Sequence, residues 1–98
     1  MAVIISEKIR EKLALKHNVT PDEVEQCFAN RNGKYLKDTR EDHATDPPTL
    51  WFIAETDYGR KLKVAFVPKN GNDYLRSAFE PNSTELSIYA KRGAIPAK

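Results

Sequence analysis

The sequence predicts one α+β domain in which two N-terminal helices and a C-terminal helix pack on an antiparallel sheet of three or four strands. Its 98 residues supply enough chain for one compact core. Before residue 33 the apolar residues recur at helical spacing, and after it they alternate with polar residues as in strands. A helical pattern returns after Pro81. The expected order is α-α-β-β-β-β-α, with residues 1–93 as the domain and 94–98 as a flexible tail.

Two helices are expected at the N-terminus. Ser6 precedes the spaced apolar residues of the first helix, which runs to about His17. Thr20 and Glu23 have the spacing of a capping box and begin the second helix. Residues 30–33, Asn-Arg-Asn-Gly, end it because Asn and Gly tolerate the left-handed conformation that is common at helix ends.

The strands are expected between residues 35 and 79. Residues 35–37 form a short strand, and residues 50–56 and 61–67 form stronger ones. The dipeptide Asn70-Gly71 is a strong hairpin signal, which joins the strand ending near Val67 to one around residues 74–79.

The last helix is expected to begin with Asn82 or Ser83 as its cap and to end at Gly93. Three of its residues are expected to face inward: Leu86, Tyr89 and Ala90.

Composition excludes several classes of protein. No apolar run approaches the roughly 18 residues of a membrane span. The single cysteine, Cys27, has no second thiol for a disulfide or a paired zinc site. We therefore expect a cytoplasmic protein without a cofactor or metal. The net charge of +2 is unevenly distributed, with 0 in residues 1–31, −3 in 32–59 and +5 in 60–98.

Strand alternation predicts which side chains share a face of the sheet. The expected core residues are Leu62, Val64, Phe66, Leu75 and Phe79. Four residues then project together from the other face: Lys61, Lys63, Tyr74 and Arg76. The neighbouring strand offers this face either Trp51 and Ile53 or Phe52 and Ala54, and the pattern leaves both open.

If Trp51 joins these cations, rings and positive charges interleave, an arrangement that binds single-stranded nucleic acid. The alternative is a solvated sheet face with scattered lysines. Trp51, Lys61, Lys63 and Tyr74 are the candidate RNA-binding residues.

Several short motifs, in order over roughly residues 8–90, resemble the BrnT-type toxins of the RelE-like superfamily. They are Lys16-His17, Val19-Thr20-Pro21-Asp22-Glu23-Val24, Phe28, Trp51-Phe52-Ile53-Ala54-Glu55, Gly59-Arg60-Lys61-Leu62-Lys63-Val64-Ala65-Phe66, Ser77-Ala78, Glu85 and Tyr89. The resemblance implies a small bacterial ribonuclease toxin with helices packed on an antiparallel sheet. It also implies arrest of protein synthesis through cleavage of RNA, free or on the ribosome, and a cognate antitoxin as partner.

One segment departs from that family. Where the family has an Arg-rich run after its Ser-Ala pair, this chain has Phe79-Glu80-Pro81. Metal-independent RNA cleavage needs a base, an acid and cations that stabilise the phosphorane charge. The candidate catalytic residues are Arg60 and Arg76 as cations, and His43 and Glu80 as the two proton carriers.

Each candidate also has a purely structural interpretation. His43 lies in a polar, proline-ended stretch typical of a solvated loop. Arg60 is equally a turn residue, and Glu80 an acid that favours the start of the following helix. His17 ends the first helix, where a cation suits the helix dipole, and Cys27 lies on an apolar stripe.

Three functions remain open. The first hypothesis is a BrnT-like ribonuclease toxin that binds RNA on an open basic sheet face. The alternative is a non-catalytic RNA- or protein-binding module of the same fold, and the third is an interaction domain without nucleic-acid contact. RNA binding that weakens steeply with salt would support either of the first two.

Overall fold

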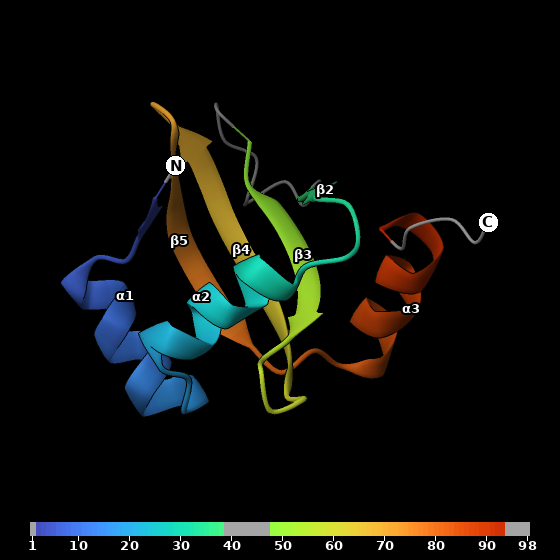
Figure 1. Cartoon of the computed structure of the whole chain (residues 1–98), viewed down its shortest axis with the longest axis horizontal. Coiled ribbons are helices and arrows are strands. Elements are labelled where there is room, and N and C mark those ends of the chain that lie inside the picture. Colours follow the sequence, from blue (N-terminus) through green and yellow to red (C-terminus); the bar gives the residue numbers. More distant parts are fainter. Residues whose placement is uncertain (1, 39–47, 94–98) are drawn as a thin grey trace.

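The structure is a computed structural model that describes residues 2–38 and 48–93, and it confirms the predicted α+β class. Its elements, in chain order, are β1 (Val3–Ile4), α1 (Glu7–Lys12), η1 (Leu13–His17), α2 (Pro21–Asn30), β2 (Leu36–Lys37), β3 (Leu50–Glu55), β4 (Lys61–Lys69), β5 (Asn72–Phe79) and α3 (Ser83–Arg92). Here η1 is a π-helical turn that continues α1. Figure 1 shows α2 crossing in front of the sheet, with α1 and α3 at opposite sides of it.

Within the described residues the sheet is mixed and has five strands in the order β1-β5-β4-β3-β2. The sequence predicted an antiparallel sheet of three or four strands, and this prediction missed the parallel strand β1. Strand β1 pairs in parallel with β5, with Val3 opposite Asp73 and Ile4 opposite Tyr74. Two residues are too few to show the alternation that reveals a strand in a sequence.

The predicted local signals are confirmed where they depend on neighbours in the chain. Thr20 and Glu23 form the capping box of α2. Asn70 and Gly71 both have positive φ, 54° and 79°, and they connect β4 to β5.

The end of α2 differs from its prediction. The helix ends at Asn30, but the next residue is extended, with φ −62° and ψ 126° at Arg31. The left-handed residue lies instead at the end of η1, where Asn18 has φ 52°. A left-handed cap turns the chain back sharply, which suits the short connection into α2.

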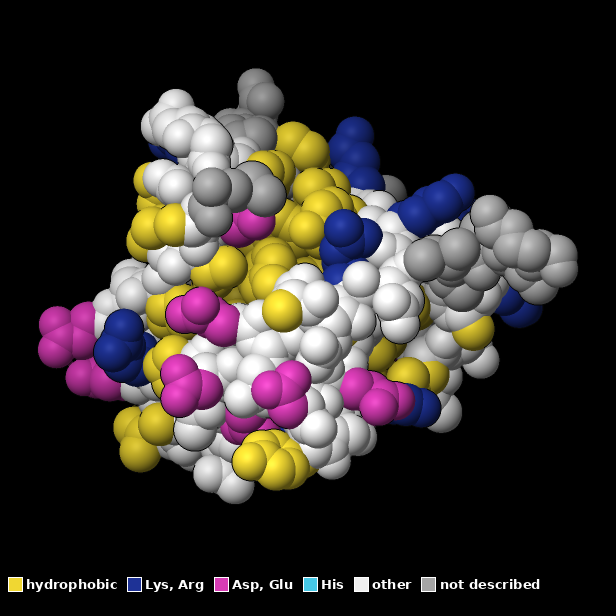
Figure 2. Space-filling model, viewed as in Figure 1, with side chains coloured by type: hydrophobic (Ala, Val, Ile, Leu, Met, Phe, Trp, Pro, Cys, Tyr) yellow, Lys and Arg dark blue, Asp and Glu magenta, His cyan; other side chains and the backbone are white. Residues whose placement is uncertain are grey.

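The main core lies between α2 and the sheet. Phe28 of α2 packs edge-on against Phe52 and Phe66, with ring centroids 4.9 and 5.3 Å apart. The largest fully buried side chains of this layer are Phe52, Phe66, Leu13, Leu62, Val19, Val24, Val64 and Cys27. Figure 2 shows the same face, where apolar side chains gather above α2 and acidic side chains below.

Helix α3 lies on the opposite face. The pairs Trp51–Ala65 and Ile53–Lys63 place these four side chains together on that face, which settles the alternative left open by the sequence. Tyr89 of α3 packs on Trp51, with ring centroids 5.7 Å apart. Of the residues expected to face inward, Tyr89 is buried and Leu86 partly buried, but Ala90 is exposed.

The predicted position of Phe79 in the main core is wrong because β5 contains a β-bulge. Ala65 pairs with Ser77 and Phe66 with Leu75, so Arg76 is an extra residue in β5. The alternation reverses at this point. Phe79 consequently lies opposite Lys63 on the α3 face rather than in the main core, and Ala78 is buried in its place.

Gly33 and Gly93 allow α3 to dock closely. A Cβ on Gly33 would overlap the Tyr89 hydroxyl and the Gly93 carbonyl. We therefore expect Gly33→Ala to lower the free energy of unfolding by about 1–3 kcal/mol through overpacking. Urea denaturation checks this, with Asn32→Ala at the neighbouring exposed residue as the control. Equal stability of the two variants would show that the contact is not tight.

Candidate functional site

The predicted RNA-binding residues Trp51 and Lys63 lie side by side beneath α3. Lys63 Nζ is 4.8 Å from the centroid of the Trp51 ring and 5.5 Å from that of Phe79. The same Nζ donates to Glu85 Oε2 of α3 at 2.8 Å. Trp51 is 8% exposed and Lys63 7% exposed. The sheet face at these two residues is therefore covered, not open as expected.

The reason is that the helices divide between the two faces of the sheet. Sequence periodicity shows that α3 has an apolar side, but it does not show which face of the sheet that side covers. A second layer needs its own buried residues, and Trp51 and Ile53 supply them.

A pocket of about 660 Å³ opens beside Trp51 and Lys63. Its lining comes from β2 and the residue after it, from β3, from β4 and from α3: Leu36, Lys37, Asp38, Trp51, Lys63, Glu85, Ile88 and Arg92. Lys37 and Arg92 were not among the candidate residues. They come within one pocket only through the pairing of β2 with β3 and the docking of α3, which no local signal indicates. In Figure 2 most of the visible Lys and Arg side chains lie on the right, the side on which Figure 1 shows α3.

Lys61 and Tyr74, the other predicted RNA-binding residues, lie apart from each other. Lys61 is opposite Glu55 at one end of the sheet, and Tyr74 is opposite Val67 toward the other. Both are exposed. The single patch expected from the sequence is thus divided among separate places.

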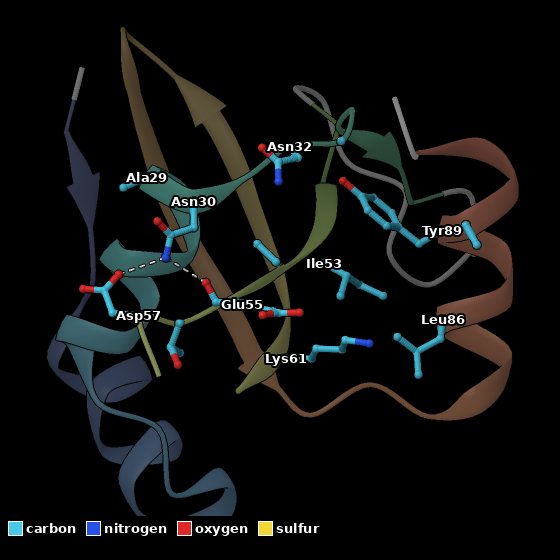
Figure 3. Close-up of a pocket in the computed structure, with 13 residues that line it drawn as sticks. Ala29, Asn30, Asn32, Ile53, Glu55, Asp57, Lys61, Leu86 and Tyr89 are labelled. Carbon is cyan, nitrogen blue, oxygen red and sulfur yellow. Dashed lines mark hydrogen bonds between the residues drawn. The ribbon is translucent and has the colours of Figure 1, made fainter. Parts of the chain in front are cut away.

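Lys61 lines a larger cleft, of about 1090 Å³, between the end of α2 and α3. Figure 3 shows the strand β3 at its back, with Ile53 and Tyr89 on one side and Asn30 on the other. Asn30 Nδ2 donates to the Glu55 carbonyl at 3.0 Å and to Asp57 Oδ1 at 2.9 Å. These contacts hold α2 against the edge of β3.

Of the predicted catalytic residues that the structure describes, Arg60 makes the most hydrogen bonds. Its Nη1 donates to Glu23 Oε2 at 3.0 Å and its Nε to Glu80 Oε2 at 2.9 Å. It also donates to the backbone carbonyls of Asn18 at 2.8 Å and His17 at 3.2 Å. The structure brings Arg60 and Glu80 together, but it does so as an ion pair.

The ion pair affects the charge states of both sides. Burial alone would lower the pKa of Arg60, but the hydrogen bonds and charges of Glu23 and Glu80 raise it. Burial likewise opposes ionisation of Glu23, but hydrogen bonds from the Thr20 backbone and from Arg60 lower its pKa overall. Both groups are charged at neutral pH.

Arg76 and His43 stand differently. The Arg76 side chain is exposed on the bulge of β5, and the Arg76 carbonyl accepts a hydrogen bond from Lys12 Nζ at 3.3 Å. His43 falls outside the described residues.

His17 is a candidate proton carrier that the sequence analysis assigned only to the end of a helix. It is the last residue of η1, as expected, and its ring lies 5.3 Å from that of Phe79. Burial lowers the pKa of His17, and the nearby charges of Lys12 and Lys16 lower it further. The imidazole is therefore neutral at pH 7 and able to accept a proton. Its contact with Phe79 depends on the β-bulge, so the sequence carries no signal for it.

Cys27 is buried in the main core, which confirms its structural interpretation. Its Sγ lies 3.6 Å from the Ala54 carbonyl. Within residues 2–38 and 48–93, no group of three or more His, Cys, Asp or Glu could hold a metal ion. No helix in that part of the chain has the length and apolar character needed to cross a membrane.

Comparison with known proteins supports the fold. No protein-family model matches the chain, and no curated protein matches it. Among solved structures, the fold is similar to that of the Brucella abortus ribonuclease toxin BrnT. The likeness covers 85% of this chain and 99% of that chain, with a TM-score of 0.61 and 21% sequence identity. The resemblance to the BrnT-type toxins is thus confirmed at the level of the fold.

The Arg60–Glu23 pair predicts a dependence of stability on pH. Because the pKa of Glu23 is lowered in the folded state, its contribution is present above the unfolded pKa and is lost as the pH falls through the folded value. The free energy of unfolding should therefore fall as the pH is lowered below 4.5, the ordinary pKa of a glutamate. Urea denaturation should show a smaller fall in Glu23→Gln, which keeps the capping-box amide, than in the control Glu25→Gln. Identical pH profiles would contradict the pairing.

Cys27 should be chemically inert in the folded protein. Burial raises its pKa to about 11, with a smaller contribution from Glu23. The thiolate fraction, and with it the rate of reaction with a thiol reagent near pH 8, should be about 100-fold below that of an ordinary cysteine. The same reagent with the urea-unfolded chain provides the reference rate. Equally fast reaction in both states would show that the thiol is accessible.

Proposed function

We propose that this protein binds RNA and cleaves it without a metal ion, as a cytoplasmic toxin of a bacterial toxin–antitoxin pair. The observation that carries the proposal is the likeness in fold to a ribonuclease toxin, which covers 99% of that toxin's chain. The cognate antitoxin is the proposed protein partner, and RNA, free or on the ribosome, is the proposed substrate.

The proposed chemistry is attack of a ribose 2′-hydroxyl on the adjacent phosphate. A base must accept the hydroxyl proton, an acid must protonate the leaving oxygen, and cations must stabilise the charge of the phosphorane. His43 and Glu80 are the proton carriers suggested by the sequence, and Arg60 and Arg76 are the cations.

The geometry adds His17 to this set. Its neutral imidazole lies at the end of η1, where the Arg60 guanidinium bonds its backbone carbonyl and also bonds Glu80. Lys12 and Lys16 supply positive charge around it. This corner of the molecule therefore combines a proton acceptor, a carboxylate and several cations, which supports proton transfer next to a bound phosphate.

A second function is favoured by one specific observation. Two of the expected phosphate-binding cations are neutralised within the fold, Arg60 by Glu23 and Glu80, and Lys63 by Glu85. An RNA- or protein-binding module that has kept the fold without the catalysis would show this arrangement.

The two functions differ in an expression experiment. Induced expression in a bacterial host should arrest growth and break RNA, and Arg76→Ala should reduce RNA cleavage about 100-fold through loss of one transition-state cation. Arg76 suits the test because its side chain is exposed, whereas Arg60 is bonded to four residues in three segments of the chain.

Arg10→Ala is the matched control, since Arg10 is an exposed cation on α1. Equal arrest by the parent and both variants would remove Arg76 from the site. Healthy growth with intact RNA for the parent itself would favour the non-catalytic module.

A further inference from the structure

Helix α3 presents an anion and an aromatic ring to the sheet. Glu85 and Tyr89 are four residues apart, so they lie on the same side of the helix. Glu85 is bonded to Lys63, and Tyr89 packs on Trp51 with an angle of 45° between the rings. Two side chains of the sheet thus contact α3: the Lys63 ammonium binds the Glu85 carboxylate, and the Trp51 ring packs on the Tyr89 ring.

The same two kinds of contact bind single-stranded nucleic acid. A lysine pairs with a phosphate, and an aromatic side chain stacks with an unpaired base. Trp51 and Lys63 form such a pair, with Nζ 4.8 Å from the ring centroid. In this structure their ligands are supplied by α3.

We propose that α3 occupies an RNA-binding site of its own sheet, with Glu85 in the place of a phosphate and Tyr89 in the place of an unstacked base. Single-stranded RNA binds Lys63 and Trp51 by displacing α3. The inference deepens the proposed function and rests on its RNA-binding part.

The docking of α3 is weak enough for displacement. Tyr89 is the only buried residue of α3, and Ile88 on the same helix is 39% exposed. Elements with few buried side chains open locally at a lower free energy than the whole protein unfolds, and α3 adds only the partly buried Leu86 and Glu85 to Tyr89. The pocket of about 660 Å³ beside it contains Lys37 and Arg92, which can attract a phosphate to the edge of α3.

The edge of β3 can recover the hydrogen bonds that displacement breaks. Leu36 pairs with Trp51, so the same register would pair Lys34 with Ile53. The Tyr89 hydroxyl stands between these two residues, donating to the Lys34 carbonyl at 2.9 Å and accepting from the Ile53 N–H.

The Gly93 carbonyl at the end of α3 accepts from the Lys34 N–H. When α3 leaves, Lys34 and Ile53 can bond each other directly and extend the pairing of β2 with β3. No backbone group of these two residues then stays unpaired, which lowers the free energy needed to open the site.

Trp51 makes displacement directly measurable because it is the only tryptophan in the sequence. The probe is a ten-nucleotide oligouridylate added at low salt, with Trp51 fluorescence and its quenching by acrylamide as readouts. Binding should change the fluorescence of Trp51 by stacking, and it should weaken steeply as salt is raised.

Glu85→Gln separates the charge from the fold. A Gln at this third helical position can still complete the capping box with Asn82, but it no longer neutralises Lys63. The variant should bind the oligonucleotide up to about five-fold more tightly, the size expected for release of one ion pair. Glu25→Gln on α2 is the control for the same change in net charge.

Tyr89→Phe is the second variant. It keeps the ring on Trp51 but removes the hydroxyl that bridges Lys34 and Ile53. We expect Trp51 to be more readily quenched by acrylamide in the absence of RNA, and RNA to bind more tightly.

The outcomes distinguish this inference from the proposed function. RNA that binds the parent, Glu85→Gln and Glu25→Gln with equal affinity, without any change in Trp51 fluorescence, would place RNA elsewhere and overturn the inference alone. Absence of RNA binding by the parent and all variants would overturn the proposed function together with it. Unchanged acrylamide quenching in Tyr89→Phe would show that the hydroxyl does not hold α3 closed.

Discussion

The hydrogen bonds of the Arg60 guanidinium join three parts of the fold that are distant in the chain, and the arrangement of these parts depends on them. It bonds Glu23 in the first turn of α2, Glu80 between β5 and α3, and the carbonyls of His17 and Asn18 at the end of η1. Arg60 itself immediately precedes β4. A planar group with several donors is suited to join segments that approach from different directions. Removing it would leave carbonyls and carboxylates in a partly buried place without their partner, so its role in the fold is established by geometry before any role in chemistry is considered.

This use of Arg60 changes how the charge of the sequence should be interpreted. The last third of the chain carries a net charge of +5, and strand alternation predicted that two of its cations, Lys61 and Lys63, bind RNA on an open sheet face. Two of its cations form ion pairs: Arg60 with Glu23 and Glu80, and Lys63 with Glu85. The cations available to a ligand are those whose side chains remain exposed, such as Arg76 and Lys61. Counts of charge along a sequence therefore overestimate the positive potential of a surface, because ion pairs form between residues that are distant in the chain.

The sequence predicted correctly those features that depend on residues close together in the chain, and it missed those that depend on distant residues. The capping box of Thr20 and Glu23 and the Asn70-Gly71 turn depend on adjacent residues, and both are present. Strand β1 depends on pairing with β5 across the length of the chain, and the β-bulge at Arg76 depends on how β4 and β5 twist together. Neither leaves a local pattern. The prediction of the candidate site suffered most from these missed features. The bulge moves Phe79 to the other face of the sheet, and α3 packs on the face that carries Trp51 and Lys63 and covers both.

The segment Phe79-Glu80-Pro81 stands where the resemblance to the BrnT-type toxins led us to expect an arginine-rich run, and its contacts have a consistent physical explanation. Phe79 packs against the His17 ring and lies under the Lys63 ammonium, and Glu80 bonds Arg60. Phe79 and Glu80 thus join the end of β5 to His17 of η1 and to Arg60 and Lys63, and we call this set of contacts the seam. Arginines at these positions would place like charges beside Arg60 and Lys63, which would destabilise the seam unless an anion such as a phosphate lay between them. The present residues supply the carboxylate and the apolar surface internally. The seam is therefore stable without a ligand, and a nucleic acid that binds near it must compete with contacts that the protein already makes to itself.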